Sequence, residues 1–518
     1  MKKTLIGRSK DYVGLALDLR KSKRHKDDTI RQNARRHVAE RMGRLRGLPQ
    51  KIGQMIAMSD DEQRADVFAD LGNAATPMPF ESTRGILEEA WHAPIESTVN
   101  HIEPDGRAAS LGQVHRAQLT DGTDVAIKVA YPGIRQAVMS DLKLVGWLSS
   151  PVGDLRRGFD LADYRHEIMR DLEEELNYET ELSNQQSFGA VATPLEGLVV
   201  PEPIVELCRE NVLVSRWEEG ETIDGATRWP EATRGALGRL ILSQFLTLLF
   251  DHGVVHGDPN PGNYRFRLGR GAKPEVVLYD YGSVLRVPKH DRLLLLRLIR
   301  DTMNMEGSPL SWLVDLGFRA DLLSPIERKL PAVCRTLFEP FLHPVKYDLG
   351  RWNRKERLDD VLGDDRWNFR MAGPAKLILL MRAFRGVVYY LSKLQAPVSW
   401  NLLLKPMLDA RASALDALEP AWEGAGGQTG TSGFQTMAKH LRIEVRKHGE
   451  RRVSLTFPAA SVENLEDLMD PDLASRLQQD GRDLDAVARS ARASGYAPGE
   501  LFRLAEEKEQ REVRLWLE

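Results

Sequence analysis

The sequence predicts an α+β fold of two lobes, preceded by a helical N-terminal extension and followed by a small α+β appendage. Three observations support this prediction. Residues 125–128 form a short apolar run of strand type, and residues 254–263 form a polar loop that contains two prolines. Residues 291–418 alternate apolar and charged positions at helical spacing. A part that contains strands therefore precedes a helical part, in which the polar loop lies.

The composition is that of an ordinary globular protein. The chain has 518 residues, enough for two or three domains, with 42% hydrophobic and 28% charged side chains. Its net charge of -3 gives no indication of a nucleic-acid partner. Two cysteines, Cys208 and Cys334, indicate a reducing compartment and argue against a disulfide or zinc scaffold.

The predicted location is cytoplasmic. The basic N-terminus is not followed by the apolar core of a secretory signal, and the uncharged stretch 240–250 is too short to span a bilayer. Residues 21–46, however, are crowded with Lys, Arg and His. That segment could bind an anionic membrane or a partner, or it could be a solvated helix face. A peripheral membrane contact is therefore left open.

The polar loop at residues 254–263 has the spacing of a phosphoryl-transfer catalytic loop. It contains His-x-Asp, and an Asn follows five positions after the Asp. In sites of the kinase type this Asp orients or deprotonates the acceptor, and the Asn holds a metal ion. Here the two residues are Asp258 and Asn263, and His256 is predicted to orient the loop. Taken alone, the loop could be a polar turn with an incidental aspartate.

Two further motifs occur in the order found in kinases. Asp280 lies in Asp-Tyr-Gly after an apolar run, and we expect a β-hairpin whose second strand delivers its carboxylate to a divalent cation. Lys128 ends Val-Ala-Ile-Lys, the strand motif whose Lys binds phosphates and pairs with a helix Glu. Alone, that motif could be an edge strand with a solvated Lys. Together, the three motifs predict ATP and Mg²⁺ as ligands.

The predicted architecture is therefore a bilobal protein-kinase-like α+β fold with a helical N-terminal extension and a small C-terminal α+β appendage. Strands are expected near each end of the appendage, which we interpret as an interaction or regulatory module. The predicted segments are a helical extension at 1–100, a kinase-like N-lobe at 101–216, a helical C-lobe at 217–420, a linker at 421–435 and an accessory domain at 436–518.

An element before the N-lobe adds a family resemblance. Lys51, Gly53 and Gln54 form Lys-x-Gly-Gln, which alone could be a helix with a Gly for close packing. Beside the kinase motifs, it resembles the UbiB-like atypical kinases, also called the AarF/ADCK family, from about residue 48 to about residue 400. The resemblance implies ATPase rather than ordinary protein-kinase behaviour and support of ubiquinone or other prenyl-lipid metabolism. It also implies that this segment, which we treat as regulatory, blocks a protein-substrate cleft.

Residues 106–117 lie where protein kinases carry a Gly-rich nucleotide loop. Small side chains let backbone amides approach phosphates, although Ala adopts fewer conformations than Gly, so the loop should be stiffer. The resemblance implies an alanine-rich nucleotide loop with altered nucleotide selectivity, in which Ala108, Ala109 and Ser110 bind the nucleotide. Arg107 departs from the family, which usually has Ala at this position.

Residues 171–184 are predicted to form a helix that carries acidic side chains. The resemblance implies that Glu181 is the partner of Lys128. It also implies that Glu175 is the first acid of a Glu-x-Asp motif, which we group with the regulatory Lys-x-Gly-Gln element. The second acid is replaced by Asn177, which removes a charge.

Residues 211–220 are predicted to be a strand that runs into a loop. In a kinase-like fold this is the hinge, where backbone groups near Val214 and Trp217 would meet adenine. Residues 235–252 form an apolar helix that is expected to support the catalytic loop from within the larger lobe.

Two other functions stay open. A small-molecule phosphotransferase of the aminoglycoside or choline kinase type shares His-Gly-Asp and a following Asn, but such enzymes usually carry an acid where this chain has Gly282. A non-catalytic nucleotide-binding scaffold would not require all of the polar motifs. The acceptor is unknown, with a prenyl lipid or a protein of lipid metabolism as the possibilities that the resemblance suggests.

Overall fold

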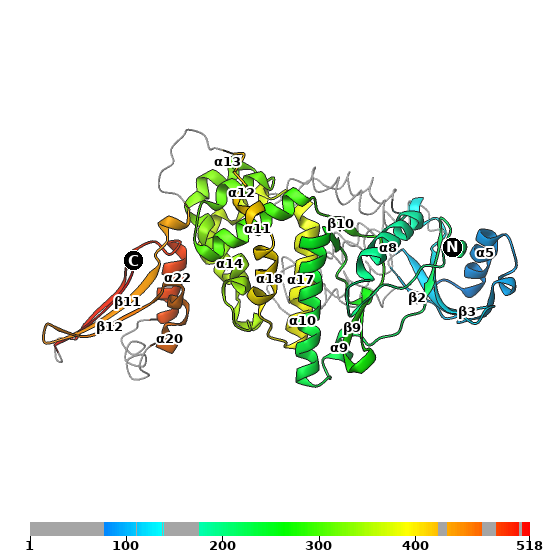
Figure 1. Cartoon of the computed structure of the whole chain (residues 1–518), viewed down its shortest axis with the longest axis horizontal. Coiled ribbons are helices and arrows are strands. Elements are labelled where there is room, and N and C mark those ends of the chain that lie inside the picture. Colours follow the sequence, from blue (N-terminus) through cyan, green and yellow to red (C-terminus); the bar gives the residue numbers. More distant parts are fainter. Residues whose placement is uncertain are drawn as a thin grey trace, which may run out of the picture. The chain divides into compact units, whose positions relative to one another are not determined.

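The computed structural model describes residues 77–109, 111–136, 138, 176–374, 376–422, 433–468, 483–506 and 510–518 (Figure 1). The chain divides into two compact units. Among the described residues, those from 77 to 287 and from 376 to 396 form the first unit, and those from 288 to 374 and from 397 to 518 form the second. The Lys-x-Gly-Gln element and Glu175 lie outside the described residues, as does Ser110.

An antiparallel sheet of five strands forms one half of the first unit. Its order is β1-β3-β4-β6, with β2 paired to β3. The predicted strand at 125–128 is confirmed and lies inside the sheet, between β3 and β6, rather than at an edge. Helix α5 packs against this sheet. The bounds are α5 Phe80–Trp91, β1 Val99–Ile102, β2 Arg107–Ala108, β3 Gly112–Leu119, β4 Asp124–Ala130 and β6 Val212–Arg216.

Helix α8, Tyr178–Ala192, lies between β4 and β6 in the chain and confirms residues 178–184 of the predicted helix. Asn177 is extended, with φ -114° and ψ 99°, and its side chain accepts hydrogen bonds from the backbone N–H groups of Glu179 and Thr180. Asn is among the preferred N-cap residues because its oxygen satisfies such amides. The residue that departs from the family pattern therefore starts the helix, so residues 176 and 177 of the predicted helix at 171–184 are not helical.

The other half of the first unit surrounds the polar loop. The predicted hairpin is confirmed: β8 and β9 are antiparallel, and β5 adds a parallel strand to them. Strand β7 enters the loop and pairs with β10. Two long helices, α10 and α17, lie side by side beneath these strands (Figure 1). The bounds are β5 Leu198–Val199, α9 Ile223–Ala226, α10 Glu231–Thr247 with a π-helical continuation Leu248–His252, β7 Val254–His256, β8 Tyr264–Leu268, β9 Pro274–Leu278, β10 Val284–Arg286 and α17 Lys376–Leu394.

The second unit combines helices with a sheet of order β12-β11-β14-β13. The strands expected near the two ends of the appendage are present as β12 and β14. Buried residues of the helices and of this sheet belong to one hydrophobic core, so residues 436–518 share a core with helices instead of forming one alone. The bounds are α11 Lys289–Asn304, α12 Pro309–Asp315, α13 Ala320–Leu323, α14 Leu330–Leu342, α15 Arg354–Leu362, α16 Arg366–Ala372, α18 Trp400–Asp409, α19 Ala412–Asp416, β11 His440–Lys447, β12 Glu450–Pro458, α20 Leu465–Leu468, α22 Leu484–Ala493, β13 Gly499–Glu506 and β14 Arg511–Leu517.

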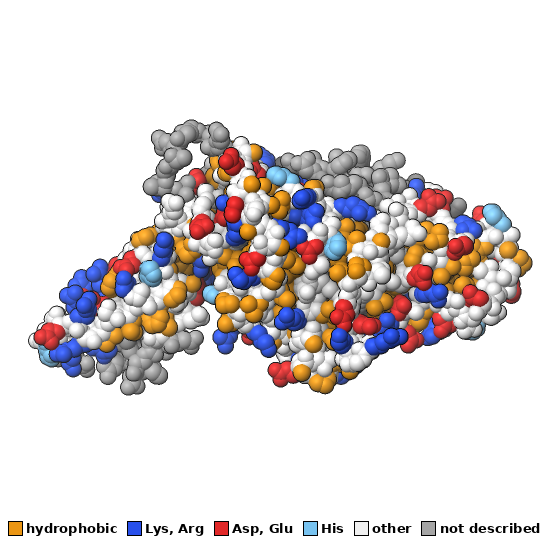
Figure 2. All heavy atoms as spheres, viewed as in Figure 1, with side chains coloured by type: hydrophobic (Ala, Val, Ile, Leu, Met, Phe, Trp, Pro, Cys, Tyr) orange, Lys and Arg blue, Asp and Glu red, His pale blue; other side chains and the backbone are white. Residues whose placement is uncertain are grey.

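Strand β12 at the edge of this sheet is exposed over most of its length. Arg451 and Arg452 are exposed on β12, and Figure 2 shows basic side chains on this part of the molecule. Val453 and Leu455 are apolar and are 39% and 41% exposed. In the described part of the chain, no helix combines the length and apolarity that crossing a membrane requires.

Candidate active site

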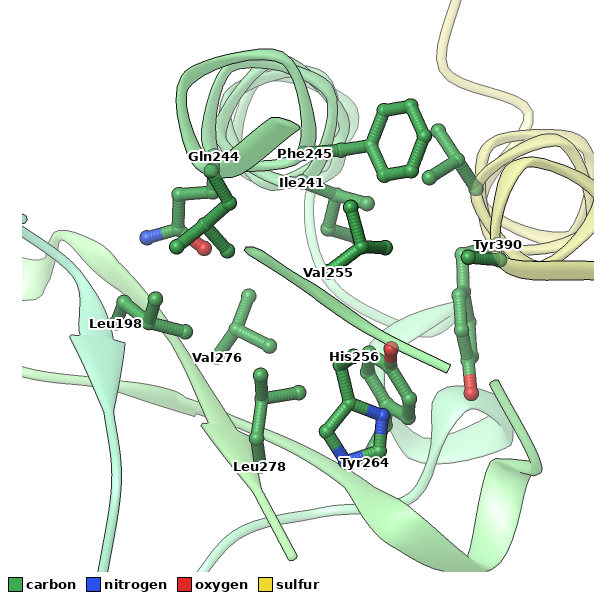
Figure 3. Close-up of a pocket in the computed structure, with 13 residues that line it drawn as sticks. Leu198, Ile241, Gln244, Phe245, Val255, His256, Tyr264, Val276, Leu278 and Tyr390 are labelled. Carbon is green, nitrogen blue, oxygen red and sulfur yellow. The ribbon is translucent and has the colours of Figure 1, made fainter. Parts of the chain in front are cut away.

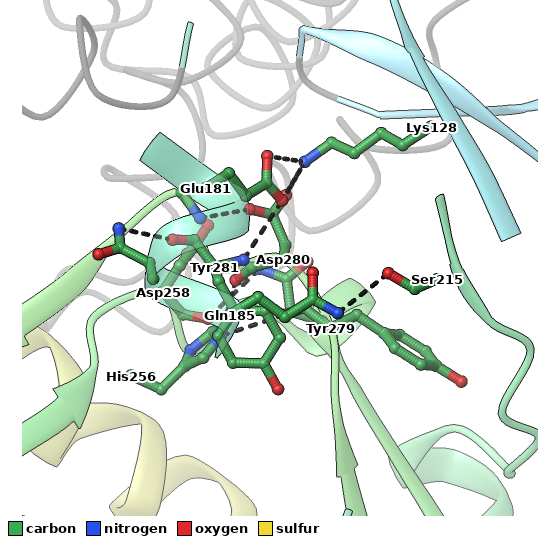
Figure 4. A network of polar contacts seen from close by, with 12 residues as sticks. Lys128, Glu181, Gln185, Ser215, His256, Asp258, Tyr279, Asp280 and Tyr281 are labelled. Atoms are coloured by element: carbon green, nitrogen blue, oxygen red, sulfur yellow. Dashed lines mark hydrogen bonds and ion pairs between the residues drawn. The ribbon is translucent and has the colours of Figure 1, made fainter. Parts of the chain in front are cut away.

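Lys128 lies at the centre of a charged cluster (Figure 4). Alternation along β4 buries Val125 and Ile127 in the sheet core and directs Lys128 to the opposite face. Its Nζ lies 2.7 and 2.8 Å from the two carboxylate oxygens of Glu181 on α8, and 3.2 Å from Oδ2 of Asp280. The structure thus brings together three of the predicted site residues.

Lys128 is charged in this environment. Burial lowers the pKa of its ammonium, but the carboxylates of Asp280 and Glu181 outweigh that effect and hold the pKa well above its ordinary value. An opposite charge at this distance favours the ionised form. The site therefore presents a fixed positive charge that two carboxylates orient.

The backbone around Asp280 is held in an uncommon conformation. Asp280 has a φ of 61°, in the left-handed region that side chains other than Gly seldom adopt. The His256 ring donates from Nε2 to the carbonyl oxygens of Tyr279 and Asp280, at 3.1 and 2.8 Å. Burial lowers the pKa of His256, so the ring is neutral and fits the predicted role of orienting the loop. Oδ1 of Asp280 accepts the N–H of Gly282 at 3.2 Å.

Tyr281 anchors the segment that carries Asp280. Its ring is 1% exposed and lies 5.4 Å from the ring of Phe188 on α8 and 5.6 Å from that of His256. The hydroxyl that distinguishes this motif from Asp-Phe-Gly donates to the carbonyl of Leu278 at 2.9 Å. The backbone N–H of Tyr281 donates to Glu181 at 3.3 Å. The extra hydroxyl is therefore satisfied, and the segment is tied directly to the helix that bears Glu181.

The polar loop at residues 254–263 places Asp258 in a buried position. Its side chain is 8% exposed and forms an ion pair with Arg382 of α17. The amide nitrogen of Asn263 donates to the carbonyl oxygen of Asp258 at 3.4 Å. Sequence reasoning missed Arg382, which lies 124 residues from Asp258 and has no recognisable motif around it.

Asp280 and Asn263 have the chemistry of magnesium ligands. Carboxylate and amide oxygens are hard donors, and Mg²⁺ in kinase-like sites takes few protein ligands and completes its shell with phosphates and water. The side-chain nitrogen of Asn263 donates to the carbonyl oxygen of Asp258. The side-chain oxygen of Asn263 takes no part in this hydrogen bond and is the atom that would bind a metal ion. Within the described ranges no group of three or more His, Cys, Asp or Glu side chains could hold a metal ion. The two residues therefore fit a metal that arrives with its phosphate ligands.

The predicted nucleotide loop is a tight hairpin between β2 and β3. Ala108 pairs with Gln113, and the N–H of Ala109 donates to the carbonyl of Gly112 at 2.8 Å. A Cβ atom at Gly112 would lie 2.3 Å from the carbonyl oxygen of Val129 on β4. Glycine is therefore required where the hairpin crosses close to the strand that carries the lysine.

The structure does not bring Val214 to the site as a nucleotide contact. Its side chain is buried in the sheet core. Its N–H donates to Sγ of Cys208 at 3.4 Å, and its carbonyl accepts from Ile204 at 2.8 Å, so both backbone groups are already engaged. At Trp217 the backbone N–H donates to Asp124 at 2.9 Å, and the guanidinium of Arg116 lies 5.0 Å from the centre of the ring.

A buried polar network joins strand β3 of the β2–β3 hairpin to helix α5. The sequence did not predict this network. The amide nitrogen of Gln113 donates to Oγ1 of Thr83 at 2.9 Å and lies 2.8 Å from Nε2 of His115. Nδ1 of His115 donates to the carbonyl of Glu103 at 2.7 Å, so Nε2 is the acceptor. Burial lowers the pKa of His115. The alternation of residues 112–115 could have signalled buried positions, but not their partners.

The architecture places the protein in the protein-kinase-like class. A solved structure with this fold is the Rv3197-erythromycin complex from Mycobacterium tuberculosis, which aligns with a TM-score of 0.50 and 23% identity over 77% of this chain and 98% of that chain. Residues 70–309 match the family model of the ABC1 atypical kinase-like domain. This match and the names of the relatives below confirm the resemblance to the UbiB-like atypical kinases that the motifs predicted.

Curated relatives carry corresponding names. "Atypical kinase coq-8, mitochondrial" from Caenorhabditis elegans is 30% identical over 48% of this chain and 34% of that protein. "Atypical kinase COQ8B, mitochondrial" from Rattus norvegicus is 26% identical over 64% of this chain and 63% of that protein. The chain thus spans less than two thirds of the length of either relative.

Proposed function

We propose that this protein is an ATP-dependent phosphoryl-transfer enzyme, an atypical kinase or ATPase that acts with Mg²⁺. The observation that carries the proposal is the contact of Lys128 with both Glu181 and Asp280. These groups come from a strand, a helix and the segment after β9, and the ammonium is charged although its side chain is only 16% exposed. A surface lysine in an incidental ion pair would not require such convergence.

Each residue has a distinct role in this proposal. Lys128 binds the phosphates, and Glu181 holds its side chain in place. Asp280 and Asn263 hold Mg²⁺, which when bound neutralises charge on the phosphates. Asp258 aligns the acceptor, either a hydroxyl group or water. Positioning and charge stabilisation supply most of the rate in such reactions, so loss of any one group should be costly.

In this proposal, the hairpin between β2 and β3 binds the phosphates of ATP. Backbone amides of Ala108, Ala109 and Ser110 would approach the phosphates. The hinge contact proposed for Trp217 would involve a backbone group other than its N–H, because that amide is bonded to Asp124. Lys51, Gly53, Gln54 and Glu175 remain a proposed regulatory element.

The acceptor belongs to the proposal as well. The resemblance to the UbiB-like family supports a role in ubiquinone-type metabolism, with a prenyl lipid or a protein of lipid metabolism as the acceptor or effector. A cytoplasmic location with a peripheral lipid contact is part of the same proposal. ATP turnover measured with and without anionic liposomes and prenylated phenols tests it, and stimulation by either would tie the activity to lipids.

The central test is Mg-dependent ATP turnover of purified full-length variants. Asp258→Asn and Lys128→Ala should each reduce turnover to background. Lys273→Ala is the matched control, because Lys273 is 69% exposed and pairs with Glu196 at the surface. Full turnover by either site variant would contradict the assignment. Nucleotide binding by the wild type without detectable hydrolysis, even with lipid present, would favour a scaffold instead.

A further inference from the structure

Helix α17 contacts the catalytic loop although it lies outside the matched residues 70–309. It belongs to the same compact unit as that loop. Three of its residues make the contacts: Arg382, Gly386 and Tyr390. They are spaced four residues apart and therefore lie along one face of the helix.

The first contact is the ion pair between Arg382 and Asp258. The side chains are 7% and 8% exposed, so the pair is shielded from water. A buried charge is tolerated only when it is paired, and the removal of one partner leaves the other uncompensated. The guanidinium is planar and carries its N–H donors in a fixed fork, so it fixes the direction of a carboxylate better than a lysine can.

The other two contacts bring helix and loop backbone close together. A Cβ atom at Gly386 would lie 2.1 Å from Cβ of Pro259, so only glycine permits this approach. Four residues further on, the hydroxyl of Tyr390 donates to the carbonyl oxygen of Pro259 at 3.0 Å. Both contacts are made with Pro259, the residue that follows Asp258.

Aromatic rings connect this face of α17 to the metal segment. The Tyr390 ring lies 4.7 Å from that of Tyr264, which lies 5.6 Å from His256, and His256 lies 5.6 Å from Tyr281. Tyr390, Tyr264 and His256 also line a largely apolar cavity, together with side chains of α10 and α17 (Figure 3). The catalytic loop is therefore packed against α17 on one side and against the Asp280 segment on another.

We propose that α17 is an active-site element and that Arg382 is a positioning residue, which holds the Asp258 carboxylate in one orientation toward the acceptor. The inference rests on the proposed phosphoryl-transfer function. It adds that residues 70–309 lack part of their own active site, because the partner of Asp258 comes from a helix beyond them. Arg382 acts through Asp258, whereas Lys128, Asn263 and Asp280 are the residues proposed to meet the phosphates and the metal.

The test compares full-length Arg382→Met, Arg382→Lys and Lys393→Met in steady-state ATP turnover. Lys393→Met removes an exposed positive charge from the same helix and should behave as wild type. Arg382→Met should lower kcat by about 100-fold, the scale of a misplaced reacting group. KM and the binding affinity for ATP should change less than about threefold. Arg382→Lys, which keeps the charge but loses the fork, should recover part of kcat.

A further variant keeps the inference testable if Arg382→Met does not fold. Gly386→Ala should lower kcat in the same way because its methyl group displaces Pro259.

The outcomes separate this inference from the proposed function. A wild-type protein without Mg-ATP turnover overturns both. Wild-type turnover combined with an unchanged kcat in Arg382→Met and Gly386→Ala overturns only the role of α17. A parallel loss of ATP affinity and kcat also overturns it, because that result would show a general structural role.

Discussion

The ammonium of Lys128 and the carboxylate of Glu181 are 2.7 Å apart, although 53 residues separate them in the sequence. One is carried by strand β4 and the other by the first turn of α8. Their contact requires α8 to lie against the sheet, and Gln185 on the same helix adds hydrogen bonds to Pro201 and Ser215 at 2.6 and 3.0 Å. Helix α8 is therefore fixed in the position that orients the lysine.

Glu181→Gln should weaken the use of ATP without unfolding the protein. The substitution keeps the shape of the side chain but removes the charge that orients Lys128, which would then lie closer to Asp280. We expect kcat/KM for ATP to fall about 10- to 100-fold, within the range of a lost charge-assisted contact. Glu179→Gln changes an exposed residue of the same helix and is the control. Unaltered kcat/KM in Glu181→Gln would show that the pair is not functional.

Asp280→Asn and Asn263→Ala should both raise the Mg²⁺ concentration needed for activity. Each removes an oxygen donor from the proposed metal site, and the loss of the Asp280 charge should have the larger effect. Binding gives a second measurement: Mg²⁺ with a non-hydrolysable ATP analogue should raise the melting temperature of the wild type and have little effect on Asp280→Asn. Asp224→Asn, at an exposed position, is the control. An equal Mg²⁺-dependent shift in Asp280→Asn would place the metal elsewhere.

Local patterns predicted those parts of the site that lie within one strand or one loop. The apolar run at residues 125–128 predicted strand β4, and the apolar run before Asp280 predicted the β8–β9 hairpin. The spacing of Asp258 and Asn263 predicted the polar loop at residues 254–263. In each case the same few residues determine both the chemistry and the secondary structure. A short stretch of sequence is therefore sufficient to predict both.

Contacts between distant segments could not be predicted in this way. Arg382 lies in an ordinary amphipathic helix, and nothing in its neighbours distinguishes it from Arg385 one turn later. Residues 176 and 177 were predicted to be helical but are not, because the cap at Asn177 depends on local backbone geometry that an acidic run does not reveal. The shared core of the second unit depends on tertiary packing, which periodicity does not specify.

Gly112→Ala should destabilise the first unit. The added Cβ would lie 2.3 Å from the backbone oxygen of Val129 and 2.7 Å from the hydroxyl of Tyr178, and a backbone atom cannot move aside without shifting β4. Overpacking of this kind costs about 1–3 kcal/mol in the free energy of unfolding. Gly85→Ala is the control, since its methyl group would meet nothing within 4 Å and Ala favours helix over Gly by about 1 kcal/mol. Urea unfolding should thus show opposite shifts for the two variants.

His115 should make the stability of the first unit depend on pH. Burial lowers the pKa of the ring in the folded state, so the unfolded chain binds a proton at a higher pH than the folded chain does. The contribution of the neutral ring is complete above the unfolded value of about 6.5 and is lost as pH falls below it. Melting temperatures measured between pH 7.5 and 5 should fall less steeply in His115→Asn, which can keep one donor and one acceptor. Identical slopes in the two proteins would exclude His115 as a source of the pH dependence.

The shared core of the second unit predicts that its helices and its sheet unfold together. Leu441 on β11 is fully buried in the cluster that also contains Leu298 of α11. Leu441→Ala should cost about 2–5 kcal/mol, whereas Leu402→Ala, at a position that is 53% exposed, should cost less than about 0.5 kcal/mol.

Hydrogen exchange separates a shared core from two independent ones. In Leu441→Ala, amide protection should fall in α11 and α14 as well as in β11 and β14, because helices and strands that bury the same side chains lose the same contacts. Helix α15 also packs against α22. An ion pair between Arg492 of α22 and Asp360 of α15, 3.3 Å apart, adds a polar contact between the helices and residues 436–518. Faster exchange in the strands alone, with the helices still protected, would show that residues 436–518 fold as a separate domain after all.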